Sequence, residues 1–329
     1  MKLSKGAIRT LILVAAFAVI VLLIYNLWDG RKTVAVLNFG LRYSIPLILA
    51  SIAGLMCERT GVVNIGIEGQ MLAAAFTGFF VSAAWGVWAG IVAAVVIGFL
   101  SGVFLALCAV RWRIDQIIAG TVINTMAAGF TSFFYQQGKT LKGRLPQFDI
   151  PGLGDIPVIG PVFFRELGPI AWTALILIFV MNVLVFRTRW GLRSRAVGEH
   201  PSAADTVGIP VEKFRYMNTS LAGMLAGLAG AFIAIESSGS FSRGMTNGRG
   251  FLALAIMIMG RWRPMLAAAS AVFFGLMFGI TNQLQFDKVI EIPPQFISMT
   301  PYILTLVVLA VFSGRVRPPA AAGTPYVKE

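Results

Sequence analysis

Long apolar runs, each close to the length of a membrane-spanning helix, follow one another along almost the whole chain, and short polar segments separate them. A helix needs about 20 mainly apolar residues to cross the hydrocarbon core of a bilayer. The pattern therefore predicts an all-α, polytopic membrane protein that forms one transmembrane domain over residues 1–329. It predicts about ten spans: 7–27, 38–57, 65–84, 88–110, 114–134, 168–186, 217–235, 246–260, 265–283 and 297–314.

Two of these runs need comment. The first resembles a signal peptide in its basic start, but it is long and has no clear cleavage site before Asn26, so we interpret it as an uncleaved helix. The run 246–260 is short, because Arg261, Arg263 and Pro264 end it sharply.

Composition supports the membrane interpretation. Apolar residues make up 57% of the chain and charged residues only 12%, which excludes a water-soluble enzyme, a disordered tail and a fibrous repeat. The net charge of +13 would suit nucleic acid, but in a membrane protein it first indicates basic cytoplasmic loops against membrane lipid. Cys57 and Cys108 lie in or beside apolar runs, so they are expected in the core rather than in a disulfide or a metal site.

Most of the 27 Lys and Arg residues fall on one side of the membrane if both termini are cytoplasmic. The same topology makes 187–216 a cytoplasmic loop and 135–167 an external loop. The external loop is rich in Pro and Gly, so it is a poor helix and a reasonable docking surface.

The cytoplasmic loop 187–216 carries the sharpest signal. Anchoring at lipid headgroups is enough to explain its first four arginines, Arg187, Arg189, Arg193 and Arg195. The loop also predicts a short amphipathic helix that begins at His200-Pro-Ser and ends at Gly208-Ile-Pro, with Ala203 and Ala204 facing inward. Such a helix on the cytoplasmic face is a suitable lever for another protein.

This loop, Gly191-Leu-Arg-Ser-Arg-Ala-Val-Gly-Glu-His-Pro-Ser-Ala-Ala-Asp-Thr-Val-Gly-Ile, resembles the coupling segment of membrane permeases in ABC importers for branched-chain amino acids, simple sugars and nucleosides. Three further stretches agree: Glu58-Arg-Thr-Gly-Val-Val-Asn-Ile-Gly-Ile-Glu-Gly-Gln, Leu225-Ala-Gly-Leu-Ala-Gly-Ala and Ile256-Met-Ile-Met-Gly-Arg-Trp-Arg-Pro. The resemblance covers about residues 35–314. The stretch from Glu58 is most similar to nucleoside permeases, which usually occur as two different permease chains.

The resemblance implies a permease subunit in a bacterial cell membrane, with no ATPase activity and no bound cofactor of its own. ATP and Mg would bind in a separate cytoplasmic ATP-binding cassette subunit, and an external binding protein would deliver the substrate. Consistently, Gly138-Lys-Thr matches only the end of a phosphate-binding loop, with Phe133 where its first glycine belongs. The resemblance assigns coupling to the ATPase to Gly191, Arg195, Gly198, Glu199, Pro201, Ala203, Ala204, Asp205 and Gly208.

Polar residues inside the bilayer are costly, so they are functional candidates. Asn64, Glu68 and Gln70 lie in a glycine-interrupted helix start, where freed backbone groups can face a cavity, and Asn124 lies near the middle of its span. These four are candidates for the translocation pathway. The alternative for each is a structural hydrogen bond to a neighbouring helix.

Other polar and small residues have structural interpretations. Glu58 and Arg59 are expected to form a local ion pair, and Asp115 a salt bridge with the arginines that precede it. Gly223 and Gly227 form a small-xxx-small pair that lets two helices approach closely.

A weak internal similarity relates the two halves of the chain. Glu58-x-x-Gly61 with Gly66 is similar to Glu236-x-x-Gly239 with a glycine five residues on, which would suit an inverted repeat.

Three rivals stay open. The same importer type could carry a simple sugar such as ribose. An ion-coupled secondary transporter would need more carboxylates deep in the spans, and a membrane enzyme would need a catalytic cluster, whereas His200 is the only histidine. No catalytic or metal-binding residue and no nucleic-acid partner is predicted.

Overall fold

The computed structural model describes residues 30–149, 151–156, 158–165, 167–287, 299, 303 and 317–328. Within these ranges the regular structure is helical, apart from one isolated bridge between Phe148 and Leu167. The prediction of an all-helical protein is therefore confirmed for the described part of the chain.

Six helices among the described residues are long and apolar enough to cross a membrane. Each overlaps one of the predicted spans. They are α2 (Gly30–Glu58), α3 (Ile67–Trp85), α4 (Val87–Ala106, continued to Arg111 by a π-helical turn), α7 (Pro169–Arg187), α10 (Val211–Ala231, continued to Ser237 by a π-helical turn) and α12 (Pro264–Phe286).

The other four predicted spans do not correspond to any of these six helices. Span 114–134 forms α5 (Gln116–Phe133), which is not one of the six. Span 246–260 forms α11 (Arg249–Met259), whose 11 residues make a helix only about 16 Å long, so it is not a full crossing. Spans 7–27 and 297–314 lie outside the described residues, apart from Met299 and Ile303.

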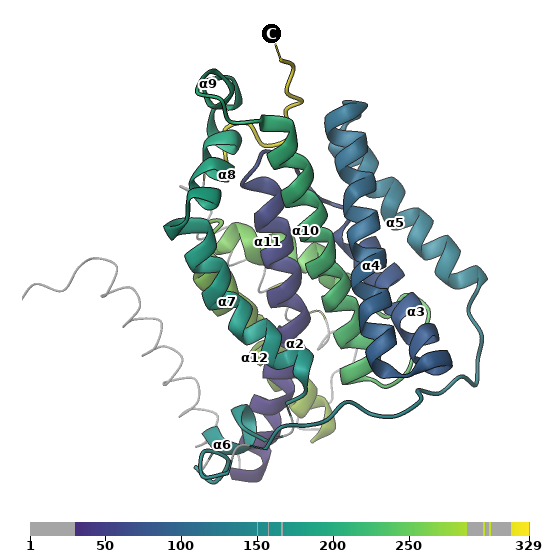
Figure 1. Cartoon of the computed structure of the whole chain (residues 1–329). Coiled ribbons are helices and arrows are strands. Elements are labelled where there is room, and N and C mark those ends of the chain that lie inside the picture. The colour runs from purple at the N-terminus through teal and green to yellow at the C-terminus, as the bar shows by residue number, and fades with distance from the viewer. Residues whose placement is uncertain are drawn as a thin grey trace, which may run out of the picture.

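Helix α2 runs through the middle of the bundle (Figure 1), and almost all of its second half is buried. Glycines allow its neighbours to approach closely. A Cβ added at Gly275 of α12 would lie 2.2 Å from the Gly40 carbonyl oxygen of α2. The pair formed by α4 and α10 is built the same way, because a Cβ at Gly98 would lie 2.3 Å from the Gly223 carbonyl oxygen.

The outer faces of the bundle are apolar. On α7 the side chains of Ile176, Phe179 and Val183 are more than half exposed, and α4 shows the same pattern. A soluble protein would avoid a continuous apolar surface of this kind, whereas lipid tails cover it without cost.

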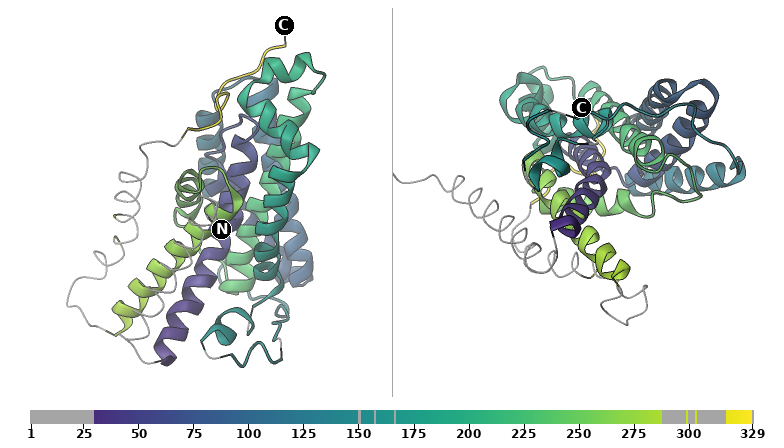
Figure 2. Two further views of the ribbon diagram at one scale, coloured as in Figure 1. Left: turned by 90° about the vertical axis from the view of Figure 1, so that its left-hand side faces the viewer. Right: turned by 90° about the horizontal axis from the view of Figure 1, so that it is seen from below.

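The two ends of the bundle differ in character. One end carries α8 (Arg189–Glu199), α9 (Pro201–Thr206) and the C-terminal residues 317–328, at the top of Figure 1. The opposite end carries α6 (Ile159–Phe163) and the long connection that leads to it from α5, and the side view in Figure 2 shows the same separation. The predicted loops 187–216 and 135–167 therefore lie at opposite ends of the molecule.

Candidate coupling site and translocation pathway

The loop 187–216, called the coupling segment below, folds into two short helices, α8 and α9. Helix α8 begins where the Thr188 hydroxyl accepts a hydrogen bond from the Gly191 backbone N–H at 3.1 Å, a usual N-terminal cap. Gly191 is required there because a Cβ would lie 2.2 Å from the Leu184 carbonyl oxygen. Pro201 opens α9, where its missing N–H costs nothing, and Gly208 follows the helix with a φ of +80°.

Helix α9 presents one buried side chain and several exposed ones. Ala204 is buried against a small apolar cluster that contains Val197, Val211 and Phe214. Ala203 is exposed, so the prediction that both alanines face inward is wrong for Ala203. The reason is the length of α9, because a helix of six residues can bury only one narrow stripe.

Helix α8 rests on the corner between α2 and α3, residues 59–66, called the α2–α3 corner below. Gly198 lies so close to it that a Cβ would come within 2.4 Å of the Arg59 carbonyl oxygen. The guanidinium groups of Arg59 and Arg195 both lie over the Phe186 ring, 5.7 and 5.2 Å from its centre. Glu199 is exposed at the end of α8.

Glu58 and Arg59 do not pair with each other as expected. The Glu58 carboxylate accepts a hydrogen bond from the Trp262 indole N–H at 2.6 Å, and Arg59 donates to the Trp262 carbonyl oxygen at 2.8 Å. Burial lowers the pKa of Arg59, yet a guanidinium stays protonated in proteins. The two residues therefore tie the end of α2 to the turn between α11 and α12.

Asp115 also differs from the expectation of a salt bridge. Its carboxylate caps α5, accepting from the backbone N–H groups of Ile117 and Ile118 at 2.8 and 3.1 Å. An aspartate directly before an apolar helix is a recognisable N-terminal signal, so the capping role of Asp115 could have been predicted from the sequence.

Asn64 and Gln70 form a buried pair. The Asn64 amide N–H donates to the Gln70 amide oxygen at 3.0 Å, and neither side chain exposes any surface. The remaining Asn64 oxygen and Gln70 nitrogen have no hydrogen-bond partner. The pair lies behind the surface of the molecule in this conformation.

Asn124 holds the α2–α3 corner against α5. Its amide oxygen accepts from the Gly69 N–H at 2.7 Å and its amide nitrogen donates to the Ile65 carbonyl oxygen at 3.0 Å. Gln116, the first residue of α5 and about two turns before Asn124, accepts from the Val63 N–H at 2.6 Å. Sequence reasoning selected Asn124 and missed Gln116, which lies at a predicted helix end and carried no signal of its own.

Glu68 caps the short helix α11. Its two carboxylate oxygens accept hydrogen bonds from the N–H groups of Gly248 and Gly250 at 2.8 and 2.6 Å. Carboxylates at a helix N-terminus are favoured both by these free donors and by the helix dipole. Glu68 is half-buried, as is Asn124, so both retain some exposed surface.

A second carboxylate, whose capping role was not predicted from the sequence, caps another helix at the other end of the bundle. Glu236 accepts from the N–H groups of Ile170 and Ala171, the first residues of α7, at 2.7 and 3.1 Å. The internal similarity had singled out Glu236, but as the partner of Glu58 rather than of Glu68.

Helix α5 has one face without a partner among the described residues. Ile118, Val122 and Met126 are exposed there, and so are the threonines Thr121 and Thr125. Each threonine hydroxyl bonds to the carbonyl oxygen four residues earlier on the same helix. The face is therefore apolar with a narrow polar strip.

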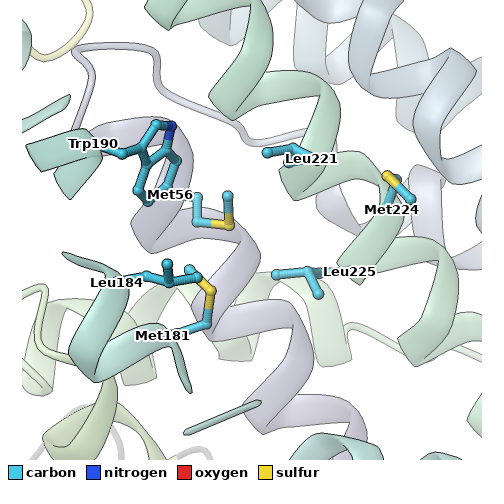
Figure 3. Close-up of a pocket in the computed structure, with 7 residues that line it drawn as sticks. All are labelled: Met56, Met181, Leu184, Trp190, Leu221, Met224 and Leu225. Atoms are coloured by element: carbon cyan, nitrogen blue, oxygen red, sulfur yellow. The ribbon is translucent and has the colours of Figure 1, made fainter. Parts of the chain in front are cut away.

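A cavity of about 350 Å³ opens between α2, α7, α8 and α10 (Figure 3). It is a poor site for a hydroxyl-rich substrate, because its walls are almost entirely apolar and hydrogen-bonding groups fix such ligands. The lining residues are Met56, Met181, Leu184, Trp190, Leu221, Met224 and Leu225.

No group of three or more His, Cys, Asp or Glu residues suited to a metal ion occurs in the described part of the chain. Cys57 and Cys108 are both buried and free.

Comparison with known families decides the assignment. Residues 36–311 match the family model described as branched-chain amino acid transport system / permease component. The chain belongs to this family. Residues of the coupling segment, the α2–α3 corner and α11 all lie within the matched range, so the permease is a multi-pass membrane protein of the ABC importer class.

Individual relatives are similar over most of their length. The guanosine ABC transporter permease protein NupQ of Bacillus subtilis is 39% identical over 302 residues, which cover 87% of the permease and 94% of the relative. The nucleoside ABC transporter permease protein NupC of Lactococcus lactis is 39% identical with the same coverage. A second Bacillus subtilis protein, the guanosine ABC transporter permease protein NupP, is 26% identical over 78% of the permease and 77% of its own length.

Proposed function

We propose that this chain is the transmembrane permease subunit of an ATP-driven importer that carries nucleosides across a bacterial cell membrane. The observation that carries the substrate assignment is the 39% identity, over 87% of the chain, to two permeases named for guanosine and nucleosides. In this proposal the chain crosses the membrane ten times and both termini are cytoplasmic. The short helix α11 then crosses together with the non-helical residues 238–248 that precede it. The end that carries α8 and α9 is then the cytoplasmic end, which the arginines of α8 favour.

In this proposal the ATPase subunit, which binds ATP and Mg, docks on the exposed face of α9. The contact would involve the predicted coupling residues around Glu199, Ala203, Asp205 and Gly208. Exposed small side chains on α9 support the assignment, because they leave room for a complementary surface. The external binding protein would dock at the opposite end, on the loop 135–167.

The unpartnered face of α5 is the proposed contact with a second permease chain. A different chain is favoured because two distinct proteins of Bacillus subtilis, NupQ and NupP, are both named guanosine permeases. The pathway would run beside α5 and the N-terminus of α11, where Glu68 and Asn124 keep exposed surface. Asn64 and Gln70 would shape its wall from behind.

The docking assignment is tested by placing a charge on α9. Ala203→Glu adds a carboxylate at an exposed position without disturbing the buried Ala204 cluster. Burying that charge unpaired at a docked interface costs about 2–5 kcal/mol, so copurification of the ATPase and nucleoside uptake should both fall more than about tenfold.

The matched control is Ala84→Glu, an exposed alanine at the opposite end of the bundle. This variant should bind the ATPase as the unaltered chain does. Retained uptake and retained ATPase binding in Ala203→Glu, with normal insertion of both variants, would contradict docking on α9.

A further inference from the structure

The C-terminal residues 319–326, called the C-terminal strap below, fold back onto the coupling end of the bundle. Pro319 and Ala321 are buried, and two tight turns shape the segment. In the second turn the Thr324 N–H donates to the Ala321 carbonyl oxygen, and Gly323 has the φ of +79° that a type II turn requires at this position. The strap therefore has a defined conformation.

One side of the strap is bonded to the coupling segment. The Ala321 N–H donates to the Gly198 carbonyl oxygen at 2.9 Å, at the end of α8. The Ala320 N–H donates to the Glu199 carboxylate at 3.3 Å. Beyond the strap, the Lys328 ammonium lies 3.6 Å from the Asp205 carboxylate of α9, and an ion pair at the surface with an exposed lysine contributes little.

The other side of the strap is bonded to the α2–α3 corner. The Gly323 N–H donates to the Gly61 carbonyl oxygen at 3.1 Å. Gly61 has a φ of +87°, and a Cβ there would lie 2.9 Å from the Ala321 carbonyl oxygen. The corner and the strap are therefore in direct van der Waals contact as well as hydrogen-bonded.

The buried Arg215 of α10 hydrogen-bonds both to the α2–α3 corner and to the strap. It is 1% exposed, and its guanidinium donates to the Thr60 carbonyl oxygen at 3.1 Å and to the Thr324 carbonyl oxygen at 2.9 Å. Two of its three nitrogens, Nε and Nη1, make these bonds, and the buried Nη2 has no partner in the described part of the chain. A guanidinium that donates to backbone carbonyls on two separate segments fixes their relative position, because its fork of donors is rigid. Thr60, which accepts one of these bonds, lies four residues before Asn64 and eight before Glu68 in the sequence.

We propose that the C-terminal strap is a positioning element that ties the coupling helices to the α2–α3 corner, so that a displacement of α9 reaches the segment carrying Asn64 and Glu68. The inference rests on the proposed function, since it presupposes that the ATPase moves α9. Without the strap the ATPase would still dock on the exposed face of α9, but its movement would no longer be transmitted fully.

The test uses the complete importer in proteoliposomes, with three measurements on each variant: copurification of the ATPase, stimulation of ATP hydrolysis by the guanosine-loaded binding protein, and guanosine uptake. One variant stops after Arg317 and lacks the strap. Its control stops after Tyr326 and loses only the last three residues. A coupling free energy of the usual size predicts that the first variant keeps the ATPase but loses about fivefold or more of both stimulation and uptake, whereas the control stays within about twofold.

A pair of point variants repeats the test without shortening the chain. Arg215→Gln removes the guanidinium that bonds to Thr60 and Thr324. The control, Lys213→Gln, removes the same charge from an exposed position on the same helix. Arg215→Gln should assemble and lose stimulation, while Lys213→Gln should not. Full stimulation in the chain that stops after Arg317 would overturn the proposal. Failure of both it and Arg215→Gln to assemble would also overturn it, because the strap would then serve assembly alone.

The readouts separate this proposal from the proposed function. The unaltered importer could fail to take up guanosine while a loaded binding protein still stimulates its ATPase. In that case the substrate assignment fails, and the proposal for the strap is tested by the stimulation of ATP hydrolysis alone. If Ala203→Glu remains fully coupled, docking on α9 fails first.

Discussion

Two carboxylates, Glu68 and Glu236, hold the first turns of helices that are distant in the sequence. Each accepts two backbone N–H groups, Glu68 from the start of α11 and Glu236 from the start of α7. The N-terminal N–H groups of a helix need acceptors, and inside a membrane protein water is a poor substitute. A cap supplied across the bundle therefore replaces the local serine or aspartate cap that is usual in soluble helices.

Removing the Glu68 cap should cost stability. Glu68→Ala leaves the Gly248 and Gly250 N–H groups without their acceptor, so we expect a loss of about 1–2 kcal/mol, with a smaller loss for Glu68→Gln, which keeps one acceptor oxygen. Thermal unfolding in detergent measures this effect, and uptake should fall in the same order. Glu68→Ala with full thermal stability and reduced uptake would show instead that the carboxylate acts on the substrate.

At this scale the sequence singled out four polar residues but not what they bond to, and their part in the translocation pathway stays a prediction. Asn64, Glu68, Gln70 and Asn124 stand out because polar groups are rare in apolar runs. Their partners are backbone groups and side chains of other segments, and no spacing rule links Glu68 to Gly248. The expected pair of Glu58 with Arg59 was wrong for the same reason, because Trp262 arrives from another part of the chain.

The apolar runs predicted well which segments form helices, and less well what each of these helices does. The six long apolar helices fall where the runs were drawn, because length and hydropathy alone decide that a helix can cross. Helix α11 begins at Arg249, three residues after the predicted start, because Gly248 has a φ of +76°. Its end at Met259 lies within one residue of the predicted end, which Arg261, Arg263 and Pro264 mark in the sequence. The late start depends on backbone conformation, which a hydropathy pattern does not report.

Glycine contacts hold α4 and α10 together, and this can be tested. Gly223→Val would place its Cβ only 2.2 Å from the Gly98 carbonyl oxygen. Overpacking of this kind typically costs about 1–3 kcal/mol, so the melting temperature of the purified permease should drop.

Gly129→Val is the matched control, because Gly129 of α5 has no atom within 4 Å of an added Cβ. The control should melt close to the unaltered permease in the absence of the second permease chain. Equal melting of the two variants would show that α4 and α10 are not packed as described.

Across the whole molecule, the separation of the coupling segment from the loop 135–167 follows from an odd number of crossings between them, which the sequence predicted. The C-terminal strap was not predicted from the sequence, because the segment 317–328 is short and carries no motif. The hydrogen bonds that join the strap to the coupling segment and to the α2–α3 corner come from its backbone N–H groups, and every residue except proline has such a donor.

The claim that this chain imports nucleosides is tested most directly by uptake of labelled guanosine into cells that have or lack it, with excess unlabelled nucleoside or ribose as competitor. We expect uptake to be lost with the chain and to be suppressed by unlabelled nucleosides but not by ribose. Uptake should also stop on ATP depletion and resist a protonophore. Unchanged guanosine uptake without the chain, or loss of ribose uptake in its place, would contradict the nucleoside assignment. Uptake that a protonophore abolishes while ATP is maintained would contradict an ATP-driven importer.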